Sequence, residues 1–257
     1  MKTIRTFIKI AIASLFCILT MASCSELSLS ETKLKFSEYN EMKSFIVRTD
    51  LNWWMAEQPE WVSIAKIEEN GKTIVEVTPE KNHSLESRKG KIKIQTAEKY
   101  YIVDIFQDGI KLKKESGDLG LSVEWSTCNL GATKSTDFGS YYTWDKIHDY
   151  QNNEYRLPTR EEQGELIRNC NCVWGEKNGV KGCYFVAKNG NYVFLPAAGI
   201  LDGSDVYDIG SDGYYWSSSA SVSSSGAGSL RFSSYGVGTH DCYRYDGLSV
   251  RLVRGKE

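Results

Sequence analysis

The sequence predicts a protein built mainly of β-strands in two successive domains, the first being an all-β sandwich of the immunoglobulin type. Three observations support this. Between residues 25 and 109, short segments alternate apolar and polar residues with a period of two. Turn-forming residues separate these segments at the spacing common in β-sandwiches. Beyond a short charged linker at residues 110–117, Gly, Ser and Tyr become more frequent and the alternation is lost, which indicates a second domain over residues 118–254.

The first 24 residues carry the features of a bacterial export signal. A basic start with Lys2, Arg5 and Lys9 precedes an apolar run that is too short to span a bilayer. The run ends in Met-Ala-Ser-Cys, which resembles a lipobox, so we expect cleavage before Cys24 and lipidation of its side chain. Two or three acyl chains anchor a protein far better than one. The predicted location is therefore the cell envelope, lipid-anchored to the outer membrane on its periplasmic or its outer face; the alternative is an ordinary cleaved signal.

Composition and charge exclude several classes of protein. With 41% hydrophobic and 25% charged residues, the 257-residue chain is neither disordered nor a polytopic membrane protein. The formal net charge is −2, and loss of the three cations of the predicted leader would make it −5. Both halves of the remaining chain are mildly acidic. We therefore expect no electrostatic capture of nucleic acid or of anionic lipid.

Four strands of the first domain are marked by β-branched and aromatic residues that alternate with polar ones. They are expected at Phe45–Thr49, Thr73–Thr78, Gly90–Gln95 and Tyr101–Phe106. Six further pieces occur in a consistent order, namely Leu34–Ser37, Asn52-Trp53, Pro59–Ser63, Asn82, Arg88–Gly90 and Val103–Gln107. In these pieces the segment resembles a BACON domain, a family named for a proposed link to carbohydrate.

Three tryptophans of this domain raise the question of a sugar-binding platform, because aromatic faces stack on sugar rings. Alternation with polar neighbours favours a core position for Trp53 and Trp61. Trp54 points to the opposite side of an extended strand from Trp53 and is therefore the candidate for exposure and for ligand binding. We expect the domain to act as a spacer, with sugar binding as the alternative.

One helix of the second domain is well marked. Thr159 and Glu162 have the spacing of a capping box, in which each side chain accepts a hydrogen bond from the backbone N–H of the other residue. Leu166 and Ile167 would then face the core, and the helix would end near Cys170. The rest of the domain is expected to consist of loops and short strands, among them Tyr192–Leu195 and Leu248–Val253.

Seven landmarks span the second domain: Asp118–Trp125, Cys128–Ala132, Phe138–Trp144, Tyr155–Thr159, Phe194–Gly199, Gly213–Ser219 and Ser249–Arg254. Together they resemble the Fibrobacter-type major paralogous domain, a C-type-lectin-like fold abundant in gut bacterial lipoproteins. The resemblance implies an α+β fold with one main helix, a small twisted sheet and long loops presented for recognition. It also implies distant kinship with formylglycine-generating enzymes.

That kinship raises the question of catalysis. The segment Cys242–Tyr245 looks like the cysteine-bearing strand of formylglycine-generating enzymes, whose copper chemistry needs a second nearby thiolate. No cysteine lies between Cys183 and Cys242 to supply it. Four aspartates between residues 202 and 212 lack the closing glutamate of an EF-hand, so a solvated loop is favoured there over a calcium site. The serine-rich segments lack a nucleophile elbow, and His240 and Asp241 diverge on an extended strand. We predict no enzymatic activity, no cofactor and no metal.

Residues 220–246 instead have the composition of a binding surface. Tyr, Ser, Gly, His and Asp follow one another in irregular order, a mixture that antibody paratopes favour. The predicted ligand-binding residues of this segment are Tyr235, His240, Asp241, Tyr243 and Tyr245. The expected ligand is a glycan or a protein at the cell surface. The alternatives are a structural or adhesin subunit of a surface assembly and a formylglycine-generating-type enzyme.

Five cysteines remain after Cys17 and Cys24 are set aside, so at least one lacks an internal partner. The Asn178-Gly179 pair predicts a tight hairpin turn that would bring Cys172 and Cys183 together as a disulfide. Cys128, Cys170 and Cys242 stay unassigned. Near the end of the chain, two arginines, Arg251 and Arg254, are expected to anchor the last strand to buried carbonyls or carboxylates.

Overall fold

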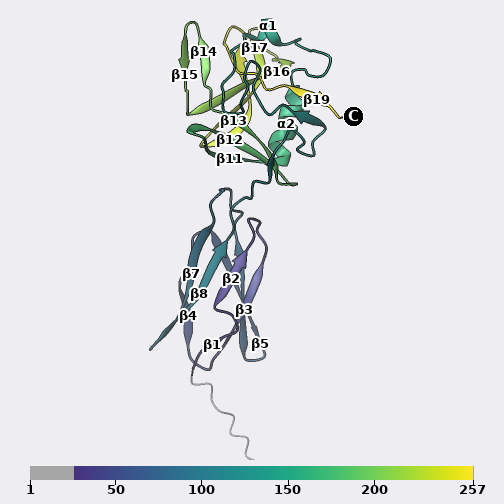
Figure 1. The fold of residues 1–257 in the computed structure, drawn as a ribbon. Helices are drawn as coiled ribbons and strands as arrows, with labels where there is room; N and C mark the ends of the chain where they lie inside the picture. Colours follow the sequence, from purple (N-terminus) through teal and green to yellow (C-terminus); the bar gives the residue numbers. More distant parts are fainter. Residues whose placement is uncertain (1–25, 257) are drawn as a thin grey trace, which may run out of the picture.

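The computed structural model describes residues 26–256, so the predicted signal peptide and Cys24 lie outside the described residues. Strands predominate within this range, which confirms the expected β-rich fold. Two helices accompany them, α1 (Trp144–Ile147) and α2 (Arg160–Asn169). The strands form two groups that lie end to end along the long axis of the molecule (Figure 1). We call residues 26–109 the N-terminal part and residues 110–256 the C-terminal part.

The N-terminal part consists of two four-stranded sheets that share one core. Their strand orders are β1-β3-β6-β5 and β2-β8-β7-β4, and of these pairings only β2–β8 is parallel. The strands are β1 (Ser28–Leu29), β2 (Lys33–Phe36), β3 (Lys43–Arg48), β4 (Trp53–Glu57), β5 (Val62–Glu69), β6 (Lys72–Pro79), β7 (Arg88–Thr96) and β8 (Tyr100–Gln107). The four strands predicted from alternation are confirmed as β3, β6, β7 and β8.

The period-two alternation explains the core of this part. Phe45 and Val75 from one sheet meet Ile92 and Val103 from the other in a single buried cluster. Each such side chain contributes roughly 1.5–3 kcal/mol when it is fully buried. Trp53 and Trp61 pack against the same cluster, but they are only partly buried rather than in the core as expected. Lys66 and Arg88 cover their outer faces, with the Lys66 Nζ 4.2 Å from the Trp53 ring centroid and the Arg88 Cζ 4.3 Å from that of Trp61.

The C-terminal part contains one four-stranded sheet, one three-stranded sheet and two two-stranded pairings, β10–β19 and β14–β15. The four-stranded sheet has the order β11-β12-β13-β9, and the three-stranded sheet has the order β16-β17-β18. The strands are β9 (Lys114–Glu115), β10 (Val123–Trp125), β11 (Cys170–Lys177), β12 (Val180–Ala187), β13 (Asn191–Pro196), β14 (Ile200–Asp202), β15 (Asp205–Tyr207), β16 (Asp212–Ala220), β17 (Gly226–Ser233), β18 (Gly236–Tyr243) and β19 (Val253–Gly255). The regular strands here are longer than the sequence pattern suggested.

The segment expected as a linker, residues 110–117, is part of this architecture. Lys114 and Glu115 form β9, which pairs in parallel with β13. Ile110 is buried in a cluster with Tyr184, against which Leu85 of the N-terminal part also packs. The charged residues of the segment suggested a solvated connection, but its apolar side chains pack inward between them.

The hairpin predicted from Asn178-Gly179 is present between β11 and β12. Both residues have positive φ angles, 50° and 81°, as a two-residue turn of this handedness requires. The turn sets a register in which Cys172 and Cys183 occupy diagonal positions on the two strands. They form a disulfide with a Cα–Cα distance of 5.8 Å, the pairing that the turn predicted.

The capping box predicted for α2 is also confirmed. The Thr159 Oγ1 accepts a hydrogen bond from the Glu162 N–H at 3.2 Å, and a Glu162 carboxylate oxygen accepts one from the Thr159 N–H at 2.8 Å. Arg156 holds the same carboxylate, with a shortest N–O distance of 2.6 Å. Leu166 is fully buried and Ile167 packs against the core, so the helix presents the face that was expected.

The strand predicted at Leu248–Val253 is wrong in extent. Only Val253 belongs to a strand, β19, whereas residues 247–249 make isolated bridges. The segment is buried, and its backbone bonds go to scattered partners in loops and in β16 rather than to one neighbouring strand along its length. The two arginines do anchor it. Arg251 donates to the Asn129 side chain and to the carbonyls of residues 126 and 194, and Arg254 pairs with Glu124.

Candidate ligand-binding site

The segment 220–246, expected to be irregular, folds largely as the hairpin β17–β18. Strand β17 lies in the centre of its sheet, between β16 and β18. The register places Trp216, Ser229 and His240 side by side on one face, and Tyr214, Arg231 and Gly238 in the adjacent row. The abundance of Ser and Gly conceals this strand pair in the sequence, because neither residue type favours a strand.

A hollow of about 470 Å³ opens next to this sheet. It is lined by Ile200, Tyr214, Ser221, Ser223, Ser225, Gly226, His240, Asp241, Cys242, Tyr243 and Asp246. Three of the predicted ligand-binding residues, His240, Asp241 and Tyr243, are therefore brought together. The volume lies within the range of small-molecule sites, roughly 300–1,000 Å³.

Two exposed tyrosines stand at the side of the hollow. The rings of Tyr243 and Tyr245 stack with centroids 5.1 Å apart and planes 7° apart. They are 56% and 64% exposed. The stack fixes two amphipathic rings that can contact the apolar faces of a ligand without first losing much side-chain freedom.

Asp246 lies beneath this pair and is only 7% exposed. One of its carboxylate oxygens accepts a hydrogen bond from the Tyr243 N–H at 3.0 Å. Burial raises the pKa of the Asp246 carboxyl, and the charge of Asp202 raises it further. Asp202 comes from the hairpin β14–β15, which is held in place by two backbone hydrogen bonds between Leu201 and Gly247, at 2.7 and 2.8 Å.

Asp241 is engaged by neighbouring side chains. Its carboxylate accepts a hydrogen bond from Ser221 at 2.7 Å and pairs with Arg160 of α2 at 2.5 Å. The hydrogen bond from Ser221 and the nearby guanidinium lower the pKa of Asp241. The carboxylate therefore ties the serine-rich loop and β18 to α2, and it shapes the hollow more than it reaches into it.

Two predicted ligand-binding residues lie away from the hollow. Tyr235 is 99% exposed but sits in the turn between β17 and β18. The length of β18 separates it from Tyr243, about 23 Å at 3.3 Å per residue. Trp54 is 49% exposed and belongs to the N-terminal part. Tyr235 instead lines a second hollow of about 410 Å³, which it shares with His240.

The titratable groups in and around the hollow can be described one by one. Across residues 26–256, no group of three or more His, Cys, Asp or Glu side chains could hold a metal ion. Burial raises the pKa of the Cys242 thiol, whose sulfur lies 3.4 Å from the Ser229 hydroxyl. His240 and Asp241 are neighbours on a strand, and their side chains point to opposite faces. Neither helix of the described chain is long and apolar enough to cross a membrane.

Several residues of the hollow were not predicted as binding residues. Asp246 follows Tyr245 directly, so its place beside the tyrosines could be read from the sequence, but its burial could not. Ile200 gave no such signal, because β14 is brought to the hollow by the contact of Leu201 with Gly247, 46 positions further along the chain.

Comparison with known proteins identifies no family. No protein-family model matches the chain, and no curated protein matches it. A Bacteroides ovatus GH5 xyloglucanase in complex with a heptasaccharide has a TM-score of 0.31 and 15% identity over 35% of this chain and 20% of the xyloglucanase chain. A protein from Bacteroides thetaiotaomicron solved by NMR has a TM-score of 0.25 and 14% identity over 32% of this chain and 86% of its own. Domains 5–6 of the S-layer protein SbsC have a TM-score of 0.26 and 12% identity over 88% of this chain and 96% of the SbsC chain. The chain thus spans about a fifth of the xyloglucanase, and likenesses this weak carry no argument.

Proposed function

We propose that the protein is a non-enzymatic, lipid-anchored lipoprotein of the cell envelope whose C-terminal part recognises a glycan or a protein. In this proposal, residues 25–109 form a BACON-like domain of immunoglobulin type, and residues 118–254 form a C-type-lectin-like domain. The observation that carries the proposal is the stacked pair Tyr243 and Tyr245 beside a polar hollow of about 470 Å³.

The lining of the hollow matches the chemistry of a sugar. The tyrosine rings offer apolar faces to the C–H face of a pyranose, and the hydroxyls of Ser221 and Ser225 together with His240 offer hydrogen-bond partners for its hydroxyl groups. A protein loop rich in polar side chains would use the same groups. Because Asp241 and the tyrosines are already held by neighbours, little ordering is needed when a ligand binds.

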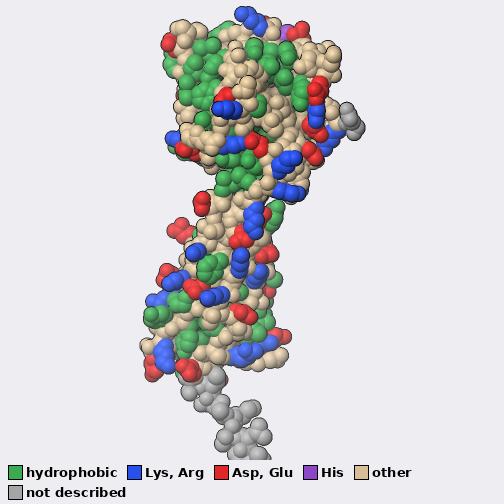
Figure 2. All heavy atoms as spheres, viewed as in Figure 1, with side chains coloured by type: hydrophobic (Ala, Val, Ile, Leu, Met, Phe, Trp, Pro, Cys, Tyr) green, Lys and Arg blue, Asp and Glu red, His purple; other side chains and the backbone are tan. Residues whose placement is uncertain are grey.

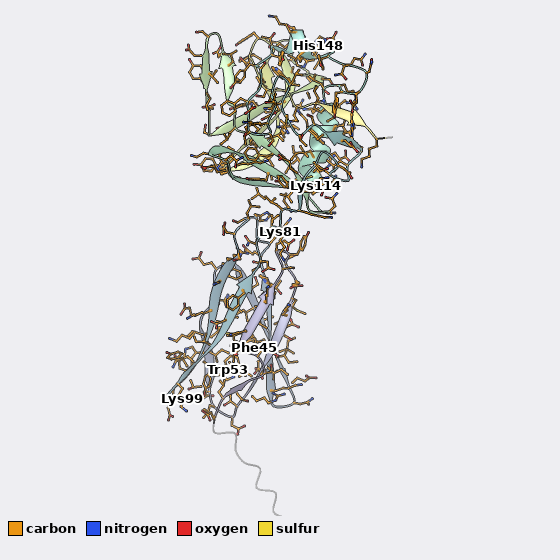
Figure 3. All side chains as sticks on the ribbon, in the orientation of Figure 1. Phe45, Trp53, Lys81, Lys99, Lys114 and His148 are labelled. Atoms are coloured by element: carbon orange, nitrogen blue, oxygen red, sulfur yellow. A yellow bond between two sulfur atoms is a disulfide. The ribbon has the colours of Figure 1, made fainter. Side chains whose placement is uncertain are left out.

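A spacer role for the N-terminal part is supported by how the two parts meet. Leu85 packs against the cluster that contains Ile110, and the Lys81 ammonium donates a hydrogen bond to the Asn171 side chain at 2.5 Å. Lys81 lies at this junction (Figure 3), and β1, the first strand, lies toward the far end of the N-terminal part (Figure 1). A lipid on Cys24 would thus hold the C-terminal part at a distance from the membrane.

The experiment is a glycan array probed with the wild-type protein and with the double variant Tyr243→Ala/Tyr245→Ala. We expect at least a tenfold loss of affinity for a glycan that binds in the hollow, because both aromatic contacts are removed. The matched control is Tyr235→Ala, which removes an exposed tyrosine far from the hollow and should bind like the wild type. Equal binding by the double variant would reject the site.

Other measurements distinguish the alternative functions. A stoichiometric complex recovered from native membranes through a surface other than the hollow would favour an assembly subunit. Turnover of a small molecule would favour an enzyme. The anchor is tested by Cys24→Ser, which we expect to remove the lipid mass and to release the protein from the membrane fraction.

A further inference from the structure

The two outer faces of the N-terminal sandwich differ in charge. On the sheet β1-β3-β6-β5, the outward residues Arg48 and Lys72 are balanced by Glu69 and Glu76. On the sheet β2-β8-β7-β4, the outward residues comprise five lysines, Lys33, Lys35, Lys89, Lys91 and Lys93, against the two acids Glu57 and Asp104. We call these seven residues, with the outward Trp54, Gln95, Tyr100, Ile102 and Phe106, the lysine face.

The lysine face arises directly from alternation. Lysines at every second position of β2 and β7 point outward, while Leu34, Ile92 and Ile94 between them fill the core. The whole N-terminal part has more acidic than basic residues, so its net charge hides this segregation. Figure 2 shows Lys and Arg side chains interleaved with hydrophobic ones on this part of the molecule.

The strand register arranges the lysine face in four rows across the sheet. Lys35, Phe106 and Lys89 form the first row, and Lys33, Asp104 and Lys91 form the second. The third row contains Ile102, Lys93 and Glu57, and the fourth contains Tyr100, Gln95 and Trp54. Strands lie about 4.8 Å apart and alternate residues about 6.7 Å apart, so the four rows span roughly 20 Å. The lysines of β2 and of β7 therefore stand on the two sides of β8.

Most of these lysines lack an acidic partner. Lys35 pairs with Asp108 at 3.5 Å, an acid that Lys111 approaches more closely, at 3.1 Å. Among the described residues, the other four lysines make no ion pair within 4.0 Å. Lys89 and Lys93 lie over the rings of Phe106 and Tyr100, at 5.8 and 4.7 Å from the centroids.

Asp104 is the one acid in the first two rows and stands between two cations. Like charges held this close on a surface repel one another, and a bound polyanion would relieve that repulsion. The fourth row adds aromatic surface, since Trp54 is 49% and Tyr100 is 62% exposed. This row lies at the end remote from the C-terminal part, where Trp53 and Lys99 are labelled in Figure 3.

We propose that the lysine face binds an acidic polysaccharide, a linear glycan that carries carboxylates or sulfates. Two lines of cations with a strand between them fit an extended polyanion that runs along β8, with its acidic groups facing lysines on both sides. The exposed aromatic row supplies a stacking surface for a sugar ring, which a bare polyanion site would not need. This site is separate from the hollow of the C-terminal part and stands without the function proposed for it.

The test uses residues 24–257 with Cys24→Ser, which retain all described residues. Binding is measured to immobilised heparin and to immobilised polygalacturonate at about 50 mM salt, where exposed charges are weakly screened. The test variant is Lys33→Gln/Lys89→Gln/Lys91→Gln. The matched control is Lys134→Gln/Lys146→Gln/Lys188→Gln, which removes the same charge from exposed positions of the C-terminal part. Thermal unfolding of both variants checks that they fold.

We expect the wild type to bind at least one probe with an affinity that falls steeply as salt is added. The test variant should bind at least tenfold more weakly, and the control should stay within about twofold of the wild type. Trp54→Ala should weaken binding to the polysaccharide by threefold or more. Absence of binding to both probes, or equal losses in both triple variants, would overturn the proposal. Stronger binding to vesicles of phosphatidylglycerol and phosphatidylcholine would assign the face to an anionic membrane instead.

Discussion

Removal of the disulfide between Cys172 and Cys183 is the perturbation whose size follows most directly from the structure. The bond closes a loop with a sequence separation of 11 residues. In the chain-entropy model, a loop of this length restricts the unfolded state by about 3 kcal/mol at 25 °C. For a protein of this size, about 3 kcal/mol corresponds to a fall in Tm of roughly 6–12 °C.

The assay is thermal unfolding followed by near-ultraviolet circular dichroism, with and without a thiol reductant. Trp174 faces Cys183 across the hairpin and reports on its surroundings. We expect reductant to lower the Tm of the wild type and to leave that of Cys172→Ala/Cys183→Ala unchanged. The double variant should melt somewhat below the reduced wild type, because Cys183 is fully buried and its sulfur also fills core volume.

Two results would refute this reasoning. An unchanged wild-type Tm in reductant would mean that the crosslink does not restrict the unfolded chain as argued. A non-reducing peptide map that joins Cys183 to a cysteine other than Cys172 would show that the hairpin turn does not set the pairing.

Three further predictions concern single side chains. Thr159→Ala should destabilise the protein by about 1 kcal/mol in urea unfolding, because the N-cap of α2 is lost; Thr133→Ala, in a loop, is the control, and equal effects would contradict the capping role. Burial raises the pKa of Asp246, so the folded state binds the carboxyl proton more tightly than the unfolded state does, and stability falls as pH rises above the ordinary aspartate value of 3.8. Asp246→Asn should therefore raise the Tm at pH 7 and lose this advantage near pH 3. A difference in Tm between variant and wild type that stays the same at both pH values would contradict the assignment. Burial raises the pKa of the Cys170 thiol to about 12, whereas Cys128 is partly exposed. At pH 8, iodoacetamide should therefore modify Cys128 in the folded protein and reach Cys170 only after unfolding. Equal modification rates for the two thiols would refute the burial of Cys170.

Much of the fold could be predicted because local signals and the tertiary structure agree. Period-two alternation located β3, β6, β7 and β8, since an exposed face and a core face leave that pattern in the sequence. The Thr159–Glu162 capping box starts α2 and the Asn178-Gly179 turn closes the β11–β12 hairpin, and in both cases the interacting residues are close in sequence. Such signals need no knowledge of the rest of the chain.

The features that were missed depend on distant partners. The segment Leu248–Val253 has strand-like composition, but its hydrogen bonds go to scattered partners in several loops and in β16. The hollow needs β14 beside Gly247, a contact that no local pattern encodes. The lysine face was visible as alternation in β7, yet only the register with β8 and β2 shows that the lysines of two strands share one surface.

The central claim is that the hollow beside Tyr243 and Tyr245 receives the ligand. The most direct measurement is hydrogen–deuterium exchange of the wild-type protein with and without the uncharged glycan or the protein that it binds most tightly. We predict slower exchange in residues 221–226 and 240–247 and unchanged exchange in the turn that contains Tyr235. Protection confined to other segments, with these two unchanged, would contradict the account.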